Sequence, residues 1–525
     1  MRRCLAKAKA FLRDEDGVLA EPTCFTVVSM VAVGAIGIDL MRLERDRANL
    51  QYTLDRAVLA AADLDQTLDA DVVVLDYLTK AGLEQYYSAP IENSGLGYKS
   101  VEATINTSFD THWLDMMAFR IAESPEGIDI PITATSRAEE SIDGLEISLV
   151  LDVSGSMTRN SRLTNLQAAA KDFIDTMVAN TTDGKMSISI VPYATQVSVE
   201  KNLIEQYNLD KVHDHSYCVN FDGPDFNTTS LSTGEPLEQT MHFSPWSSYD
   251  RRDNNSQLVD SPVCVEASDT SRAILPFQKD AATLKTFIDN LWGGGNTSID
   301  IGMKWGTTLL DPSARPAISA LTAGSTASIP NDFSARPSAY TDPDTIKVIV
   351  LMTDGQNTSQ YYVESDHREG VSDVWYHAGE DRYSSYYPPY NQYRWQGYSG
   401  WKNTPYKGDE SVRLGYPDLL ADTPLKYLYK NIYNWMSSAK STWYYGVYHS
   451  YGNSEKNTRT RSICEAAKDQ GIIVYTIGFE APSNGVAVLQ DCASSDSHYF
   501  DVQGLEIADA FSSIATSIRQ LRLTQ

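Results

Sequence analysis

Residues 145–156 read LEISLVLDVSGS and join a short apolar run, Leu145–Leu151, to the pattern D-x-S-x-S, Asp152–Ser156. An apolar run of this length is typical of a strand buried on both faces of a parallel sheet. In open α/β sheets, ligands bind outside the carboxyl ends of the strands. The sequence therefore places an aspartate and two serines where such a sheet binds ligands.

The chain beyond this stretch alternates apolar runs with amphipathic helical patterns. The spacing predicts strands over 186–191, 346–352, 472–479 and 498–502, the last at a sheet edge, and helices over 163–179, 280–292, 299–310, 462–470 and 505–521. This alternation predicts an α/β domain over residues 144–525, with a doubly wound, mostly parallel sheet covered by helices on both faces.

Two further loops of this domain carry oxygen-bearing side chains next to predicted elements. Gly293–Ser298 (GGGNTS) precedes the predicted helix 299–310, and Thr353–Gly355 (TDG) follows the predicted strand 346–352. The candidate metal ligands are the carboxylates of Asp152 and Asp354 and the hydroxyls of Ser154, Ser156 and Thr297.

This donor set suits a hard divalent cation. Mg²⁺ takes about six oxygen ligands at about 2.1 Å and retains some of its water. Two carboxylates leave the cation electrophilic, with one position open to an acidic ligand from another molecule. Each loop alone is also an ordinary feature, a serine-rich helix cap, a glycine turn or an Asp-Gly turn. Their combination in three loops favours the metal site.

The three loops together resemble the metal-ion-dependent adhesion site (MIDAS) of von Willebrand factor A (vWA) domains. The resemblance covers about residues 145–520, and long insertions are its departures. It implies a vWA-type fold and a binding module without catalytic turnover. In that module Mg²⁺ or Mn²⁺ is held by Asp152, Ser154, Ser156, Thr297 and Asp354.

Three stretches interrupt the alternation, at about residues 193–274, 311–344 and 361–457. The third contains 18 of the 30 tyrosines and five of the nine tryptophans. Tyrosine and tryptophan provide large contact areas at low entropy cost. This stretch is therefore either an aromatic recognition surface or a packed insertion with its own small core, and we favour the second interpretation.

The N-terminus combines a basic leader with an apolar run. Residues 1–13 contain five basic residues and no acidic one, and residues 23–38 read TCFTVVSMVAVGAIGI. We expect residues 1–18 to be a cytoplasmic leader and residues 19–41 an uncleaved transmembrane anchor, because a helical pattern continues past the run without a break. A cleaved secretory signal is the alternative.

Residues 42–143 are expected to form a periplasmic helix and a small α+β stalk. Leucines and alanines spaced three, four and seven apart continue the helix to about residue 68. Residues 99–106 and 127–135 alternate apolar and polar side chains, which is typical of strands.

The distribution of charge separates the anchor from the rest of the chain. The net charge is −26, and residues 1–13 (+5) cancel residues 14–41 (−5), so the whole −26 belongs to residues 42–525. An acidic body excludes a nucleic-acid binder, which needs a basic face, and it suits a solvated body outside the membrane.

The number and positions of the cysteines are those expected of a chain whose body is exported. Cys4 and Cys24 lie in the leader and the apolar run, and four others lie in the body. Four cysteines allow three pairings, and proximity in the sequence favours Cys218–Cys264 and Cys464–Cys492. Four buried free thiols are the alternative.

The N-terminal motifs resemble the TadE/TadG-like segment of Tad/Flp pilus-assembly proteins, to about residue 66. The resemblance rests on DEDG at 14–17, GID at 37–39 and LQYTLDRAVLAAA at 50–62, with further TadG-like phrases at 292–307, 464–468 and 489–494. It implies a single-pass protein of the bacterial inner membrane, with a cytoplasmic N-terminus and a periplasmic body. Glu21 lies four residues after Gly17, whereas prepilin processing sites have five, so processing is not expected.

These features predict a membrane-anchored, non-catalytic, Mg²⁺-dependent binding protein in Tad/Flp pilus assembly, anchoring or adhesion. The expected partners are the inner membrane, through residues 19–41, and a pilus or secretion protein that presents an acidic residue. The alternative is a surface-exposed vWA adhesin for an extracellular or host ligand. Enzymatic activity is not expected, because G-x-S-x-G and H-E-x-x-H motifs are absent from the sequence. His213-x-His215 is interpreted as an incidental loop feature.

Overall fold

The computed structural model describes residues 20–523, except residues 64–65, 67, 96–97, 112, 114–128, 142–143, 251–257 and 325–326. The predicted leader, residues 1–18, lies outside the described residues. The chain divides into two compact units, residues 1–141 with 523–525, and residues 142–522.

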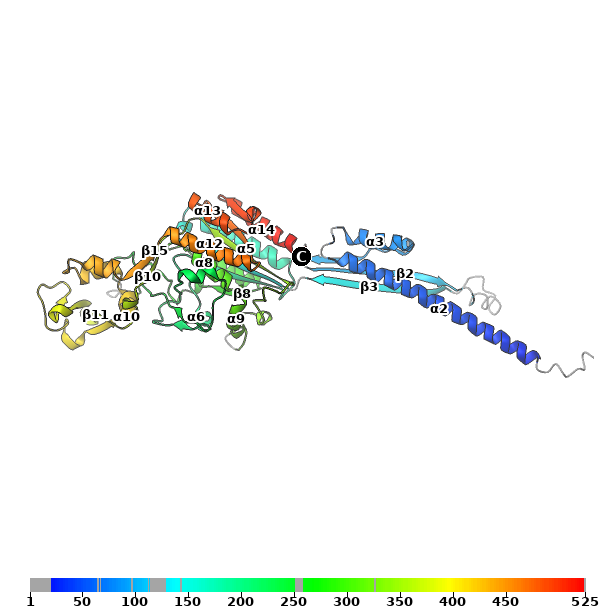
Figure 1. Ribbon diagram of the computed structural model, residues 1–525, viewed down its shortest axis with the longest axis horizontal. Helices are drawn as coiled ribbons and strands as arrows, with labels where there is room; N and C mark the ends of the chain where they lie inside the picture. The colour runs from blue at the N-terminus through cyan, green and yellow to red at the C-terminus, as the bar shows by residue number, and fades with distance from the viewer. Residues whose placement is uncertain are drawn as a thin grey trace, which may run out of the picture. The chain divides into compact units, whose positions relative to one another are not determined.

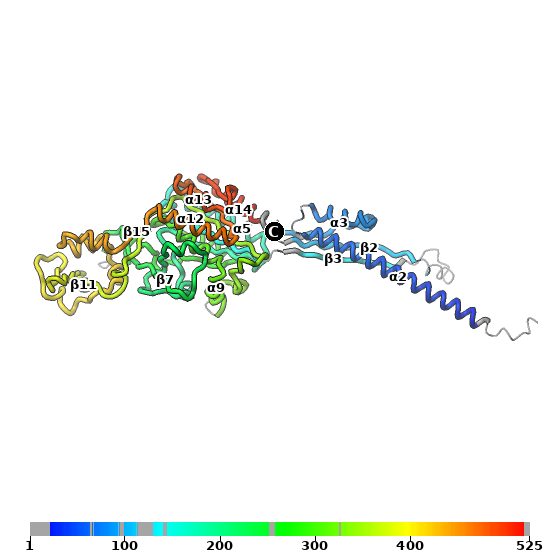
Figure 2. Tube along the Cα trace, in the orientation of Figure 1, coloured from blue at the N-terminus to red at the C-terminus, as the bar shows by residue number. Residues whose placement is uncertain are grey.

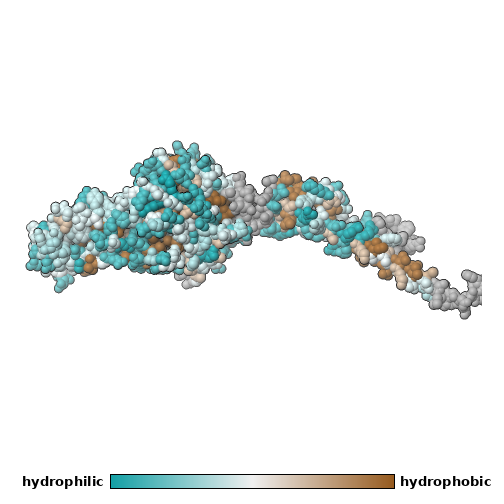
Figure 3. Space-filling model, in the orientation of Figure 1, coloured by the Kyte–Doolittle hydropathy of each residue, from teal (hydrophilic) through white to brown (hydrophobic). Residues whose placement is uncertain are grey.

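The first unit contains one long helix, α2 (Ala20–Ala62), so the predicted anchor and the following helix are continuous. Its Pro22–Ala62 part is long and apolar enough to cross a membrane, judged by length and composition. Apolar side chains near its start are exposed, with Phe25 79% and Met30 70% exposed. Figure 3 shows brown, hydrophobic residues along this helix. Contiguous exposed apolar side chains are typical of a surface that lipid or another protein covers.

The C-terminal half of α2 packs against a small antiparallel sheet. The sheet has the order β1 (Ile91–Gly95), β2 (Tyr98–Asp110), β3 (Asp129–Ser141), and α3 (Ala70–Lys80) completes the unit. The shared core includes Leu54, Val58, Val74, Leu78, Val101 and Ile105. Asp39, near the end of the predicted anchor, is buried and accepts a hydrogen bond from the Trp113 backbone N–H at 2.8 Å.

The second unit is an α/β structure around a mostly parallel sheet, and several of its elements are labelled in Figure 1. In the described residues the strand order is β17 (Tyr499–Val502), β16 (Ile473–Phe479), β9 (Thr345–Thr353), β4 (Gly144–Asp152), β5 (Met186–Tyr193) and β8 (Leu275–Gln278). All neighbouring pairs are parallel except β5 and β8. The strand predicted at residues 498–502 lies at an edge, as expected, and the unpredicted β8 forms the other edge.

Helices cover both faces of this sheet. One face packs against α5 (Arg162–Ala179), α7 (Ala281–Asp289) and α14 (Glu506–Leu523), and the other against α8 (Ile299–Thr308), α12 (Asn453–Asp469) and α13 (Ser483–Cys492). Helix α8 approaches the sheet closely because it carries glycine at Gly302, where a Cβ would lie 2.7 Å from the Tyr193 ring.

Two of the predicted insertions pack into one body with its own core. Phe243 and Val263 of the first insertion share this core with Leu419, Leu428 and Trp443 of the third. The third insertion forms a sheet of order β13 (Gln392–Trp395), β12 (Arg382–Tyr387), β11 (Val371–His377), β14 (Val412–Gly415), with α10 (Tyr416–Asp422) beside it. It joins the main fold through the antiparallel pair β10 (Gln360–Val363) and β15 (Tyr448–Tyr451). Figure 2 shows the segment around β11 in yellow, projecting from the part that holds α5 and α12.

Both predicted disulfides are confirmed. Cys218–Cys264 closes the first insertion, and Cys464–Cys492 links α12 to α13. Among the described residues, Cys24 of α2 is a free, exposed cysteine.

Candidate metal centre

The candidate centre begins at Asp152, the last residue of β4. Its carboxylate is fully buried and accepts two hydrogen bonds, from the Ser154 backbone N–H at 2.7 Å and from the Thr353 hydroxyl at 2.6 Å. β4 and β9 are parallel neighbours, so the residues that follow them meet at one end of the sheet. The register of the sheet thus brings the first and third predicted loops together.

The two serines connect Asp152 to Asp354. The Ser154 and Ser156 hydroxyl oxygens lie 3.0 Å apart, and the Ser156 hydroxyl donates to Asp354 Oδ1 at 2.6 Å. Asp354 itself is 2% exposed. Four of the five predicted ligands therefore form one hydrogen-bonded chain.

Thr297 joins this group from the second predicted loop. A Cβ built on Gly355 would lie 3.8 Å from the Thr297 hydroxyl oxygen and 3.9 Å from that of Ser156. Glycine at 355 thus leaves open the space that both hydroxyls face. The backbone of Thr297 is fixed by Thr358, whose hydroxyl accepts its N–H at 2.8 Å and whose N–H donates to its carbonyl at 2.9 Å.

Electrostatics favour a cation beside the two carboxylates. Burial, with the neighbouring charge of Asp354, raises the pKa of Asp152 to about 7. Arg162 at the start of α5 partly balances this charge, because it contacts Asp354 Oδ2 at 2.7 Å and Glu480 at 2.8 Å. Two buried carboxylates with a single arginine at one outer oxygen remain an acidic pair that a divalent cation would stabilise.

The donor set fits Mg²⁺ or Mn²⁺ better than a transition metal that prefers nitrogen or sulfur. Across the described residues, no group of three or more His, Cys, Asp or Glu side chains could hold a metal ion. The candidate centre has two such side chains and completes its set with hydroxyls. The rings of His213 and His215 lie 5.5 Å apart, and His213 is buried and bonded to the Thr240 carbonyl, in keeping with an incidental loop feature.

Supporting residues that the sequence did not reveal hold the Thr297 loop. The buried ammonium of Lys456 on α12 donates to the Thr297 carbonyl at 2.9 Å, to the Ser298 hydroxyl at 2.6 Å and to the Thr358 carbonyl at 2.8 Å. Asn357 accepts the Ile299 N–H at 2.8 Å. No motif marks Lys456, because it lies in a polar stretch about 160 residues from the loop in sequence.

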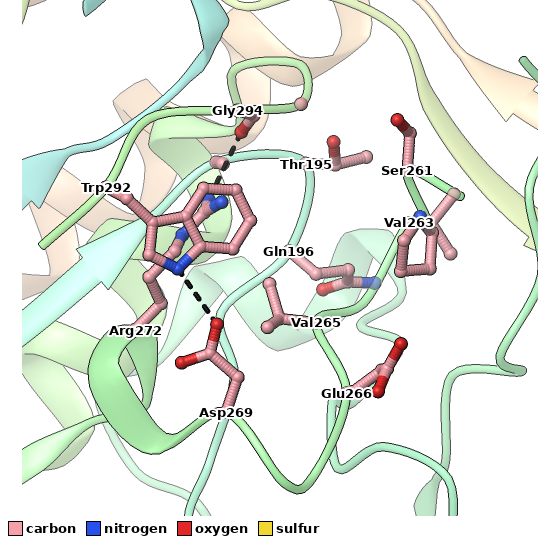
Figure 4. Close-up of a pocket in the computed structure, with 13 residues that line it drawn as sticks. Thr195, Gln196, Ser261, Val263, Val265, Glu266, Asp269, Arg272, Trp292 and Gly294 are labelled. Atoms are coloured by element: carbon pink, nitrogen blue, oxygen red, sulfur yellow. Dashed lines mark hydrogen bonds between the residues drawn. The ribbon is translucent and has the colours of Figure 1, made fainter. Parts of the chain in front are cut away.

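A cavity of about 340 Å³ opens beside the centre (Figure 4). One side is the Gly294–Gly295 turn, which precedes Thr297, and another is the segment Ser261–Glu266 of the first insertion. Trp292 and Arg272 lie on the same side as Gly294, across from Ser261 and Val263, and Thr195 and Gln196 lie between the two sides (Figure 4).

Solved structures similar to the chain include a vWF domain of a type V pili tip protein from Porphyromonas gingivalis. It is 15% identical over 72% of this chain and 95% of that chain, with a TM-score of 0.32. An adhesive tip pilin of Streptococcus agalactiae is 13% identical over 71% and 100%, with a TM-score of 0.30. Proximal thread matrix protein 1 of the mussel byssus, with a zinc-occupied MIDAS motif, is 11% identical over 73% and 46%, with a TM-score of 0.26.

Sequence comparison is informative at the N-terminus. No curated protein matches the chain. Residues 17–64 match the Tad family, described as Flp pilus-assembly TadE/G-like. This range contains most of α2 and two of the three N-terminal motifs that suggested the same resemblance. The chain therefore carries a Tad/Flp pilus-assembly TadE/G-like segment at its N-terminus.

Proposed function

We propose that this protein is a membrane-anchored, non-catalytic component of a Tad/Flp pilus system that binds a partner through a divalent cation. Residues 1–18 are the cytoplasmic leader, 19–41 the inner-membrane anchor and 42–143 a periplasmic stalk. Residues 144–525 form a vWA-type domain. Its MIDAS, made of Asp152, Ser154, Ser156, Thr297 and Asp354, holds Mg²⁺ or Mn²⁺ and leaves a position for an acidic side chain of a pilus or secretion protein.

The observation that carries this proposal is that two of the loops share one hydrogen-bonded cluster and the third places the Thr297 hydroxyl beside it. Ser156 contacts Ser154 of its own loop and Asp354 of the loop after β9, which lies 198 residues away in sequence. Glycine at Gly355 keeps the space in front of Thr297 and Ser156 open. A cation at this position would take the hydroxyl and carboxylate oxygens as ligands and would polarise the incoming carboxylate.

The hydroxyls of the two serines lie among oxygen acceptors. The Ser154 and Ser156 hydroxyls contact each other, and Ser156 donates to Asp354. Hydroxyl and carboxylate oxygens grouped in this way suit the ligands of a hard divalent cation.

The N-terminal segment supports the pilus and membrane part of the proposal. Residues 17–64 match the TadE/G-like family, and the start of α2 exposes apolar side chains along a helix long enough to span a bilayer. Burial of such side chains in lipid is favourable by about 25 cal/mol per Å² of apolar surface.

Crosslinking in living cells tests the proposal. Cells producing the wild-type chain or Asp152→Ala are treated with a membrane-permeable crosslinker, and captured proteins are identified by mass spectrometry. We expect Asp152→Ala to lose a pilus or secretion protein that the wild type captures, and EDTA to release the same protein from wild-type extracts. Capture that Asp152→Ala and EDTA leave unchanged would refute the metal bridge.

A matched control is Asp311→Asn. Asp311 is also buried and hydrogen-bonded, to Thr229 at 2.5 Å and Tyr340 at 2.9 Å. It lies near the beginning of the sheet strands, since the neighbouring Leu310 carbonyl accepts a hydrogen bond from Lys347, the third residue of β9. Asp311→Asn therefore reports the effect of altering a buried aspartate away from the metal centre, and it should retain the partner.

A further inference from the structure

One wall of the cavity beside the candidate metal centre is made of backbone that also contacts the proposed metal-binding loops. Gly294 donates its N–H to the Val153 carbonyl at 2.9 Å, and the Gly295 carbonyl accepts the Gly155 N–H at 3.0 Å. The loop that lines the cavity is thus hydrogen-bonded to the D-x-S-x-S loop on one side and continues into Thr297 on the other. A peptide bound at the cation would therefore lie next to the backbone that forms one wall of this cavity.

The opposite wall comes from an insertion. Val263 and Val265 line the cavity, and between them Cys264 forms the disulfide with Cys218. Val263 also belongs to the insertion core and donates its N–H to the Phe243 carbonyl at 3.0 Å. The wall is therefore fixed by a covalent bond and by packing, so the cavity is preformed.

Among its polar and apolar lining residues, the cavity has an aromatic ring with a cation stacked on it. Figure 4 shows Arg272 behind the Trp292 ring, and the guanidinium carbon lies 4.3 Å from the ring centroid. Arg272 is 5% exposed and donates to the Gly294 carbonyl at 3.2 Å, whereas Trp292 is 43% exposed. The Trp292 N–H donates to Asp269 at 2.9 Å, which fixes the ring.

The charges around the cavity disfavour an acidic occupant. Glu266 and Asp269 line it together with Arg272, so its lining carries two negative charges against one positive charge. Burying an ion without a matched partner is costly. An uncharged ring meets the valines, the Trp292 indole and the guanidinium, all of which interact favourably with aromatic faces or edges.

We propose that this cavity is a specificity pocket that receives an aromatic side chain from the partner segment, within two residues of the acid that binds the cation. The inference rests on the proposed metal-dependent function and specifies its partner as a segment that pairs an acidic residue with an aromatic one. The metal would bind any exposed acidic side chain of a partner. The pocket would distinguish between partner segments by the residue that lies near that acidic side chain.

A peptide array tests the pocket. Peptides with a central aspartate and each flanking position varied through all twenty residues are probed with the full-length chain in detergent, in Mn²⁺ and in EDTA. We expect Mn²⁺-dependent binding that requires the aspartate and rises about tenfold or more when one flanking alanine becomes Phe, Tyr or Trp, in line with the burial of a large apolar side chain.

Two tryptophan substitutions make the test specific. Val265→Trp fills the cavity from the insertion wall, and we expect it to abolish the aromatic preference. The control is Val371→Trp, at a 58% exposed position in the third insertion, which should keep the preference. Mn²⁺- and aspartate-dependent binding without an aromatic preference, or a preference that survives Val265→Trp, would overturn the pocket alone. Binding that ignores both aspartate and Mn²⁺ would overturn the proposed function as well.

Discussion

Single buried charges hold the Thr297 loop in place, and Lys456 is the clearest case. Its ammonium is completely buried, donates to two carbonyls and one hydroxyl, and lies 3.7 Å from the buried carboxylate of Asp300. Burial lowers the pKa of Lys456 to about 8, although Asp300 opposes this shift. Such a group fixes the loop strongly, because without it buried acceptors would lose a charged hydrogen-bond donor.

We predict that Lys456→Met weakens Mn²⁺ binding at least about tenfold, because it releases the Thr297 and Thr358 carbonyls. The matched control is Lys304→Met. Lys304 is also buried on a helix of the same face and donates to two carbonyls, those of Thr228 and Ser230, each at 2.8 Å.

Thermal unfolding and Mn²⁺ titration of both variants separate stability from positioning. Both substitutions should lower the stability by a few kcal/mol, since each removes a buried charge that satisfies buried acceptors. Of the two variants, only Lys456→Met should bind Mn²⁺ more weakly than the wild type does. Equal losses of affinity in the two variants would show that Lys456 acts only through general stability.

At the scale of the elements, the first insertion makes the free energy of unfolding depend on pH. It buries His213 and His242, whose rings lie 6.5 Å apart. Burial lowers the pKa of His213 to about 4 and that of His242 to about 3. In the unfolded chain both titrate near 6.5, so between about pH 6.5 and 4 the unfolded state binds more protons and stability falls as the pH falls.

We predict that the wild type loses more stability than His242→Asn when the pH is lowered from 7 to 5. The expected difference is about 2 kcal/mol, which is the cost of keeping one buried histidine neutral about 1.5 pH units below its unfolded pKa. Denaturant unfolding at both pH values measures it. Because the raised pKa of Asp152 acts in the opposite direction over part of this range, only the comparison of the two proteins is diagnostic. Parallel losses would contradict a neutral His242.

The sequence predicted the central elements well, because periodicity reports burial directly. The strands around Ile147, Val348 and Val474 are mostly apolar and almost completely buried, and they were predicted to within a few residues. Helix α12 was predicted from residue 462 but begins at Asn453, since its first turns are polar and show no apolar spacing. β8 is four residues long and contains Pro276, so its strand character comes from pairing with β5.

The candidate site also contains residues that the sequence predicted and residues that it did not. Asp152 and Asp354 end or follow apolar strands, so their proximity follows from parallel pairing, and Thr297 lies in a conspicuous glycine loop. Lys456 and Arg162 could not be predicted, because only the folded chain brings them to the loops. The pocket wall at Val265 depends on how two insertions pack together, which no local pattern encodes.

The whole chain combines an apolar N-terminal helix with a strongly acidic remainder. The net charge of −26 lies beyond residue 41, whereas the exposed apolar side chains gather at the start of α2. In the proposed arrangement the anchor holds the protein in the inner membrane and the acidic body stays solvated in the periplasm.

We predict that proteinase K leaves the chain intact on whole cells and degrades residues 144–525 after the outer membrane is opened. Immunoblotting with an antibody to the C-terminal helix α14 follows the digestion. A cytoplasmic protein that stays intact in both samples is the control for inner-membrane integrity. Degradation on whole cells would favour the alternative of a surface-exposed adhesin over the periplasmic location.

Calorimetric titration of Mn²⁺ into the metal-free full-length chain in detergent tests the proposed metal centre most directly. We expect one Mn²⁺ per chain for the wild type and for Asp311→Asn, with competition by Mg²⁺, and we expect Asp152→Asn to lose the binding while it remains folded by circular dichroism. A wild-type chain that binds no Mn²⁺, or an Asp152→Asn chain that binds it as tightly as the wild type, would contradict a metal-dependent binding site at the end of β4.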